Sequence, residues 1–452
     1  MNGIVLKHAF CEKSSIRVAS CGQSTWRQVM LKTIITNSPA LLTFIAALQI
    51  TLSKPQRQHV LNVVDGLVVG EGNKTLSALC RLFVNAPDPK AVADTFRESP
   101  WGAEMIRQAL RHFLVKSAFK LAQAAGIEHL VYLSIDDSLT VKDKATRHLE
   151  AVDWHHDHTA STPRRPVYKN GTVYVLCRLH VGPFSFTVDL RVYMRKKTVR
   201  RLNRKRPEGR RLKFRSKYSL ARAMLAELEQ LIPDGYPVYV LFDSWYASAK
   251  LIKWCRRRNW HVICALKSNR CLNGENVRTH NQRLKHKRYK RVTLAAADKR
   301  SRIYLVRQVD GRLNDIPFAV RVFISKCSRR DRRPRYFMST DLSLSAYQVL
   351  SRYMKRWPCE VANLYLKTRL GLGDFRMRSF EATEKFFVLT WLALAFLEWR
   401  VATQPERFKT PTGVIRQERL THARQTLRAA CEMAIQTGDL EQVMDRFAPA
   451  LT

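Results

Sequence analysis

Two short apolar segments of this sequence end in aspartates that could hold divalent cations. HLVYLSIDDS carries Asp136 and Asp137 near its end, and VYVLFDS carries Asp243. We read both segments as buried strands, and ligands of open α/β sheets collect at the carboxyl ends of strands. Carboxylates that meet there repel one another unless a cation joins them, and Mg²⁺ and Mn²⁺ prefer such oxygen ligands. Two ions about 3.5 to 4 Å apart could activate a water for phosphodiester cleavage and stabilise the leaving oxygen.

Each of these aspartates also has a simpler interpretation. A single Asp at the end of a strand commonly caps the turn or the helix that follows it. The metal interpretation therefore requires the two strands to be neighbours, and it predicts a third carboxylate on a helix packed beside the sheet.

The stretch YMKRWPCEVANLYLK offers such a carboxylate in Glu360. At 100° per residue, four side chains fall within a stripe of about 60° on one helical face: Tyr353, Arg356, Glu360 and Lys367. A polar stripe is ordinary on a solvated helix, so Glu360 could simply neutralise the cations around it. Pro358 removes a helical hydrogen bond and disfavours helical geometry at Trp357, so we expect the helix to bend or to begin there.

The order of elements around the aspartates predicts a mixed sheet flanked by helices. GTVYVLCRLHV and FSFTVDLRVYM are joined by Gly-Pro and read as an antiparallel hairpin. An amphipathic helix (SKYSLARAMLAELEQLI), a strand (VYVLFDS), a helix (ASAKLIKWCRRR) and a strand (WHVICALKS) follow. This order of strands and helices indicates an α/β protein. By analogy, it is the order found in the ribonuclease-H-like fold.

Periodicity and composition divide the 452 residues into several regions. Residues 36–125 show a helical pattern that suits a small DNA-binding domain or, equally, a plain helical bundle. Strand-like pieces and basic turns suggest a β-rich insertion within the catalytic region. The expected regions are a flexible N-terminus (1–35), a helical DNA-binding domain (36–125), a ribonuclease-H-like catalytic domain (126–400), its β-rich insertion (269–337) and a helical C-terminal region (401–452).

The charge of the chain points to a polyanionic partner. The sequence has 79 Lys and Arg against 37 Asp and Glu, a formal net charge of +42. Self-repulsion on this scale lowers stability unless a polyanion or counterions offset it, and nucleic acid is the expected partner. A ribosomal or an anionic membrane partner would give the same charge.

Two runs of basic residues could bind phosphates along the DNA backbone, although such runs usually form a solvated surface. The segment 195–217 holds 13 Lys and Arg in 23 residues, and SRRDRRPR lies in the expected insertion. The candidate phosphate contacts in these runs are Arg200, Arg201, Arg204, Lys205, Arg329, Arg330, Arg332 and Arg333.

Cysteine usage and apolar segments indicate a cytoplasmic, nucleoid-associated protein. The ten cysteines include no Cys-x-x-Cys pair, so neither a zinc ribbon nor a disulfide framework is expected. No apolar run reaches the roughly 18 to 20 residues that span a bilayer, and ALLTFIAALQI and VLTWLALAFLEW read as buried helices. The N-terminus lacks the pattern of a signal peptide.

The spacing Tyr-x2-Arg-x3-Glu-x6-Lys around Glu360 resembles the signature of bacterial insertion-sequence transposases of the DDE class. The resemblance is to the group that includes the Tn5 and Tn10 enzymes, and all four positions match. IDDSLTVK and LFDSWY are similar to the segments that carry the first two catalytic acids of the group. The similarity spans about residues 60 to 400.

This resemblance implies a metal-dependent DNA transposase. Asp243 and Glu360 would be the second and third metal ligands, and the first would be Asp136 or Asp137, with Asp136 favoured because Ser138 completes an Asp-x-Ser pattern. Tyr353, Arg356 and Lys367, defined above, would contact phosphates near the transposon end. The cofactors would be two Mg²⁺ or Mn²⁺ ions.

The expected reaction is hydrolysis at the ends of a mobile element, followed by transfer of the 3′-hydroxyl into target DNA. Its partners would be double-stranded DNA, both transposon ends and target, and further copies of the chain in a homodimer or a larger synaptic complex. A structure-specific nuclease without strand transfer and a catalytically silent DNA-binding protein derived from a transposase remain as alternatives.

Overall fold

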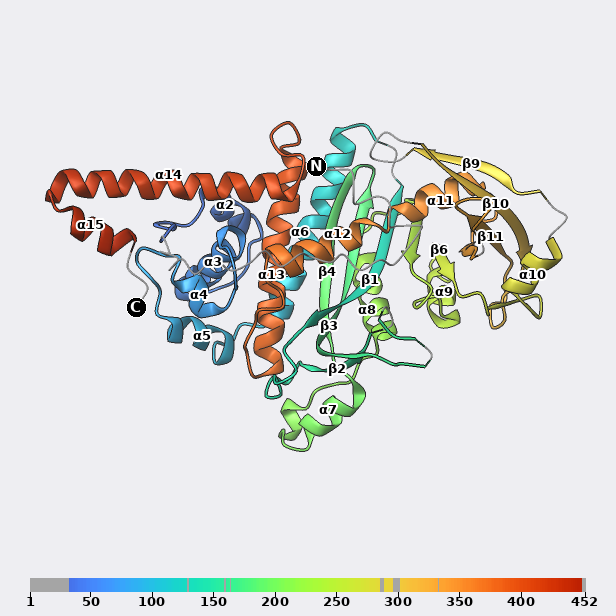
Figure 1. Ribbon diagram of the computed structural model, residues 1–452, viewed down its shortest axis with the longest axis horizontal. Helices are drawn as coiled ribbons and strands as arrows, with labels where there is room; N and C mark the ends of the chain where they lie inside the picture. Colours follow the sequence, from blue (N-terminus) through green and yellow to red (C-terminus); the bar gives the residue numbers. More distant parts are fainter. Residues whose placement is uncertain are drawn as a thin grey trace.

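The computed structural model describes residues 32–127, 130–157, 160–162, 164–284, 288–295, 301–331 and 333–448. A helical N-terminal region, a long mixed sheet and a helical C-terminal region follow one another along the chain (Figure 1). Residues 1–31, which make up most of the segment expected to be flexible, and Arg332 lie outside the described residues.

The N-terminal region is helical because its segments combine apolar spacing with clear start signals. Its helices are α2 (Pro39–Ala47), α3 (Lys54–Val69), α4 (Leu76–Cys80), α5 (Pro89–Arg97) and α6 (Ala103–Ala124). A proline occupies the first turn of α2, α3 and α5, where its missing N–H costs no hydrogen bond. The Ser38, Ser53 and Asp88 side chains before these prolines accept hydrogen bonds from the first backbone N–H groups.

A ten-stranded mixed sheet forms the centre of the protein. Its strands are β1 (Val131–Val141), β2 (Asp153–His156), β3 (Tyr168–Val181), β4 (Phe184–Tyr193), β5 (Val238–Phe242), β6 (His261–Leu266), β9 (Lys290–Ala295), β10 (Ser301–Gly311), β11 (Val320–Lys326) and β12 (Arg335–Ser339). The order is β2-β3-β1-β5-β6-β12-β11-β10-β9, and β4 also pairs with β3. The pairs β1–β5 and β5–β6 are parallel and the other pairs are antiparallel.

The expected hairpin is confirmed as β3 and β4, joined at Gly182. Gly182 has a φ of +60°, and a Cβ atom there would come within 2.6 Å of the Ile127 side chain. Both the backbone conformation and the close approach therefore require glycine at this turn.

Most strands of residues 269–337 belong to the central sheet and do not form a sheet of their own. β12 pairs antiparallel with β6, and β11, β10 and β9 extend the same sheet outward (Figure 1). Pairing with β12 satisfies the hydrogen-bonding groups along β6, which would otherwise form an open edge. Near this junction lie a two-stranded pair, β7 (Cys271–Leu272) and β8 (Glu275–Asn276), and helix α10 (Val277–Arg283).

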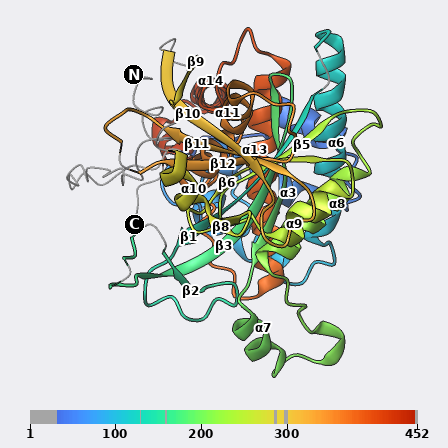
Figure 2. The same cartoon turned by 90° about the vertical axis from the view of Figure 1, so that its right-hand side faces the viewer.

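Helices cover both faces of the sheet, so the expected mixed sheet flanked by helices is confirmed. The helices that follow the hairpin are α7 (Lys196–Asn203), α8 (Lys217–Glu229), α9 (Ala249–Arg256), α11 (Ala346–Met354), α12 (Pro358–Leu364), α13 (Phe380–Thr403), α14 (Pro411–Thr437) and α15 (Leu440–Phe447). Residues of α11 pack on one face with Tyr132, Tyr239 and Phe337 of the sheet. The larger core on the other face includes α6, α8, α9 and α13, and α6 and α8 are seen to the right of the strands in Figure 2.

Helix α13 is the central helix of the larger core. It packs on β4, α6, α3 and α14, and Glu398 near its end accepts hydrogen bonds from Arg178 and from the backbone N–H of Thr187. It is long and apolar enough to cross a membrane by length and composition, which corrects the expectation that no apolar run reaches that length. Since 78% of its apolar window is buried inside the protein, this hydrophobicity is used in packing.

Candidate active site

Strand register makes Asp136 and Asp243 neighbours. β1 and β5 run parallel, and their last pair is Ile135 with Phe242. Asp136 directly follows Ile135, and Asp243 directly follows Phe242. Asp243 follows the end of β5, as expected. Asp136 and Asp137 lie inside the eleven-residue β1, which corrects their expected place at a strand end. β1 continues past β5 because β3 still pairs with it as far as Val141.

Strand alternation separates the two aspartates of β1. Successive side chains of a strand point to opposite faces. Asp136 is 9% exposed, and its Oδ2 lies 3.0 Å from Nη1 of Arg356. Asp137 accepts a hydrogen bond from Nζ of Lys217 at 2.6 Å, at the start of α8. The two carboxylates therefore have different cationic partners, Arg356 from the turn between Met354 and Pro358 and Lys217 from the start of α8.

Glu360 reaches the site because a new helix begins at Pro358. α11 ends at Met354 and α12 starts at Pro358, so the expected break near Trp357 is confirmed. Trp357 nevertheless keeps helical angles (φ −54°, ψ −37°). Glu360 lies in the first turn of α12, and its Oε1 accepts a hydrogen bond from Nη2 of Arg356 at 3.2 Å.

The junction between α11 and α12 is docked on β1. The hydroxyl of Ser134 donates a hydrogen bond to the carbonyl of Lys355 at 3.3 Å. Cys359, which is fully buried, places its Sγ 3.9 Å from the Ser134 carbonyl. Since Ser134 and Asp136 lie on the same face of β1, this docking brings the start of α12 to the side of the sheet where Asp136 lies.

Burial and like charge make Asp136 an unusual carboxyl. Desolvation raises its pKa to about 7 against the opposing effect of Arg356, and Glu360, Asp243 and Asp137 raise it further. Burial alone would lower the pKa of Arg356, but Tyr353, Asp136 and Glu360 hold it well above its ordinary value. Several carboxylates thus surround one buried position, and a guanidinium partly offsets their charge.

Asp243 also has the turn-capping role of the simpler interpretation. Its Oδ1 accepts hydrogen bonds from the backbone N–H groups of Trp245 at 2.9 Å and Tyr246 at 3.3 Å. These bonds fix the carboxylate at the end of β5. A turn that orients the side chain is compatible with metal ligation, because each carboxylate oxygen has two lone pairs.

The other two residues of the signature lie on the same side as the acids. The ring of Tyr353 packs 4.9 Å from the ring of Phe337 in β12, and burial raises the pKa of Tyr353 to about 12. Lys367 lies in a π-helical segment, Tyr365–Arg369, so the regular helical spacing does not hold as far as this residue. Burial lowers the pKa of Lys367, while Glu360 and Asp136 raise it.

A cation and an aromatic pair beside the aspartates were not expected from the sequence. Nζ of Lys217 lies 4.8 Å from the centre of the Trp245 ring, and Tyr218 stacks on Trp245 with ring centroids 4.6 Å apart. The signal for Trp245 is its position two residues after Asp243. Nothing in the basic run 195–217 distinguishes Lys217 from its neighbours, because the fold alone brings it to Asp137.

The first basic run forms helix α7 and a loop. Arg200 and Arg201 are exposed on α7, and Arg204 and Lys205 are exposed just after it. The described contacts of this segment run to β2, through Thr198 and Asp153, and to α13, through Arg206 and Glu381. The four cations are thus presented to solvent on a segment that is attached at both ends.

The second basic run lies in the connection between β11 and β12. Arg329, Arg330 and Arg333 are exposed there, and the backbone N–H of Arg333 is held by Asp331. Arg332 lies outside the described residues. These cations belong to strands far along the sheet from β1 in the strand order.

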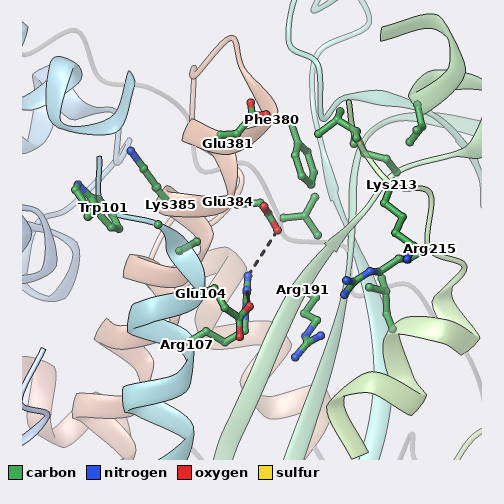
Figure 3. Close-up of a pocket in the computed structure, with 17 residues that line it drawn as sticks. Trp101, Glu104, Arg107, Arg191, Lys213, Arg215, Phe380, Glu381, Glu384 and Lys385 are labelled. Atoms are coloured by element: carbon green, nitrogen blue, oxygen red, sulfur yellow. Dashed lines mark hydrogen bonds and ion pairs between the residues drawn. The ribbon is translucent and has the colours of Figure 1, made fainter. Parts of the chain in front are cut away.

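A cavity of about 570 Å³ lies away from the acids, between the starts of α6 and α13 and strand β4 (Figure 3). Both cations and carboxylates line its wall, and Arg107 points toward Glu384 at 3.6 Å. None of the three candidate metal ligands lines it. We therefore assign the chemistry to the carboxylates and not to this cavity.

The donor set of Asp136, Asp243 and Glu360 fits Mg²⁺ or Mn²⁺. All three side chains offer hard carboxylate oxygens, and Glu360 and Asp243 lie close enough to Asp136 to raise its pKa in addition to the effect of burial. Within the described ranges, no group of three or more His, Cys, Asp or Glu side chains already has the arrangement of a metal centre. Arg356 occupies the space that joins two of the three acids.

Comparison with known proteins adds one finding. The profile of a family described as DDE superfamily endonuclease matches residues 47–310, more than half of the chain. The matched segment includes Asp136 and Asp243 and ends before Glu360. Among curated proteins, no match was found.

Proposed function

Because the chain belongs to the DDE superfamily endonuclease family, we propose that it is a DNA transposase that hydrolyses phosphodiesters at transposon ends and transfers the 3′-hydroxyl into target DNA. Membership of the family supports an enzyme that acts on DNA. The observation that carries the assignment to this site is that Asp136 and Glu360 share Arg356, with Asp243 next to Asp136 in register.

We assign Asp136, Asp243 and Glu360 as the ligands of two divalent cations. Mg²⁺ or Mn²⁺ held by these carboxylates would stabilise the charge that develops on the attacking and leaving oxygens. Asp136 is preferred to Asp137 because it lies on the side of Glu360, whereas Asp137 is paired with Lys217. This choice agrees with the Asp-x-Ser pattern of the sequence.

Cationic side chains at the site would hold the DNA. Arg356 suits bidentate contact with a phosphate, and Lys367 supplies a point charge on the same side. The exposed arginines and lysines of α7 and of the β11–β12 connection would bind phosphates farther along the duplex. Such contacts are independent of DNA sequence, so they position the substrate and do not select it.

The finer fold assignment is ribonuclease-H-like. Support comes from the central strand order β4-β3-β1-β5-β6, with an antiparallel hairpin on one side and parallel strands on the other. Both aspartates lie where β1 and β5 part, which is the edge at which open α/β sheets bind ligands. Since transposition joins two DNA ends, we further propose a homodimer or a larger synaptic complex.

The test is a strand-transfer assay with Mg²⁺ and DNA that carries the sequences flanking the gene, including any paired inverted repeats found there. A transposase forms covalent products between the repeat ends and a target plasmid. Cleavage without such products would identify a nuclease, and binding without cleavage would identify a silent DNA-binding protein. Full cleavage by Glu360→Gln would refute the ligand assignment, and Glu432→Gln, an exposed glutamate on α14, serves as the matched control.

A further inference from the structure

Arg356 lies where it blocks the carboxylates that the proposed function assigns to metal. Its Nη1 is 3.0 Å from Asp136 Oδ2, and its Nη2 is 3.2 Å from Glu360 Oε1. The guanidinium therefore bridges a strand residue and a helix residue with the two arms of one planar group. The side chains of Arg356 and Asp136 are only 15% and 12% exposed, so this arm of the bridge is shielded from solvent, whereas the Glu360 side chain is 43% exposed.

A divalent cation and this guanidinium compete for the same two acids. Both carry positive charge, so they repel each other, and the guanidinium already occupies one oxygen of each carboxylate. An arginine cannot give up its proton to make room. A cation that binds Asp136 and Glu360 together through these two oxygens must therefore displace Arg356.

Displacement of Arg356 requires another anion near its new position. The groups that act most strongly on its pKa are Tyr353, Asp136, Glu360 and Cys359, and only two of these are carboxylates. A DNA phosphate is the anion that the proposed reaction brings to this place. A guanidinium forms two parallel charge-assisted hydrogen bonds with a phosphate as it does with a carboxylate.

We propose that Arg356 closes the Asp136–Glu360 pair in the DNA-free protein and moves to a DNA phosphate when DNA binds, so that divalent cations and DNA enter the site together. This inference rests on the proposed function and adds a coupling to it. DNA raises the affinity of the site for metal, and metal raises the affinity for DNA by the same factor. In the free protein Arg356 thereby offsets part of the charge of Asp136 and Glu360 and keeps the metal site closed.

The experiment is a calorimetric titration of Mn²⁺ into the DNA-free full-length chain. Arg356→Gln should bind Mn²⁺ about tenfold more tightly than the wild type, within the range of about 5- to 150-fold that is usual for coupled sites. The matched control is Arg352→Gln, which removes the same charge one turn earlier. The Arg352 guanidinium lies 4.4 Å from the ring of Tyr239, and this variant should bind Mn²⁺ as the wild type does.

Equal Mn²⁺ affinity in wild type and Arg356→Gln would overturn the proposal, as would an equal gain in Arg352→Gln. Arg356→Lys keeps the positive charge but loses the planar guanidinium that contacts both carboxylates. Its affinity for Mn²⁺ is expected to lie between those of the wild type and Arg356→Gln. If Arg356→Gln does not fold, the proposal is tested with the wild type alone, by comparing its Mn²⁺ affinity with and without DNA. A DNA duplex of arbitrary sequence, corrected for its own Mn²⁺ binding, should raise the affinity of the wild type for Mn²⁺, and no rise would overturn the proposal.

A double variant separates this proposal from the proposed function. Arg356→Gln combined with Glu360→Gln should lose the Mn²⁺ site that the single Arg356→Gln change opens. If the double variant binds Mn²⁺ as tightly as Arg356→Gln does, Glu360 is not a ligand. In that case the assignment of the metal site in the proposed function is wrong. Loss of binding with no difference between wild type and Arg356→Gln would leave the ligands intact and refute the closing role of Arg356.

Discussion

Asp189 of β4 is expected to be the carboxylate whose removal most weakens the packing of α6 on the sheet. It is fully buried, and its Oδ2 lies 2.9 Å from Arg191 and 3.0 Å from Arg111, while Arg107 of α6 lies 3.6 Å from Oδ1. Asp189→Asn would leave three arginines close together without their central anion. Breaking a buried ion pair by removing one partner costs about 3–5 kcal/mol, and we expect a loss of that size in the free energy of unfolding.

Urea unfolding monitored by tryptophan fluorescence measures this loss. The matched control is Asp310→Asn in β10, whose carboxylate binds Arg321 through two hydrogen bonds of 2.7 and 2.8 Å but is exposed to solvent. An exposed pair contributes only about 0–1 kcal/mol. If the two variants lose equal stability, the argument that burial decides the cost is wrong.

The pH dependence gives a second readout of the same carboxylate. Burial alone would raise the pKa of Asp189, but Arg191, Arg111 and Arg107 lower it below the ordinary 3.8. A carboxyl with a lowered pKa in the folded state stabilises the protein above its unfolded pKa and loses this contribution as the pH falls through the folded value. The difference between wild type and Asp189→Asn should therefore be complete near neutral pH and should shrink below about pH 4. A difference that stays constant into acid would contradict this account.

Three further outcomes are expected. Asp136→Asn should lower Mg²⁺-dependent cleavage at least about 100-fold, and Asp137→Asn should lower it much less; the reverse order would show that Asp137 is the ligand. Gly182→Ala should lower the unfolding free energy by about 1–2 kcal/mol because φ is positive there, whereas Gly209→Ala, where a Cβ meets open space, should change it little in the same urea experiment. Burial lowers the pKa of Lys74 to about 7, so the unfolded chain binds more protons between about pH 7 and 10.5 and stability should rise across this window; thermal unfolding of Lys74→Met at the same pH values should show a flatter dependence.

Local signals in the sequence were enough to predict several elements around the central sheet, although β2 and β12 were not among them. Period-two runs and Gly-Pro predicted the hairpin of β3 and β4, and amphipathic spacing predicted α8. Pro358 predicted the start of a helix two residues before Glu360, because the constraint of proline acts only on its immediate neighbours. The position of Asp243 directly after β5 also followed from its own apolar run.

Partners that are distant in the sequence could not be read in this way. The extension of the sheet by β12 depends on β6 having a free edge, and Lys217 reaches Asp137 only because α8 lies against the sheet. The choice between Asp136 and Asp137 was open in the sequence since both are acids at adjacent positions. It depends on which face of β1 the start of α12 covers, and that is a property of packing.

The sequence by itself determined which residues have the chemistry for metal and DNA, since residue type and short-range spacing are local properties. It carried the acids, the surrounding cations and the excess of positive charge. Only the tertiary structure decided that Arg356 lies between Asp136 and Glu360. These two acids are separated by 360 − 136 = 224 positions in the sequence. The physical reason is that ion pairs form between groups that packing has already brought together, and buried apolar surface supplies most of the energy for that packing.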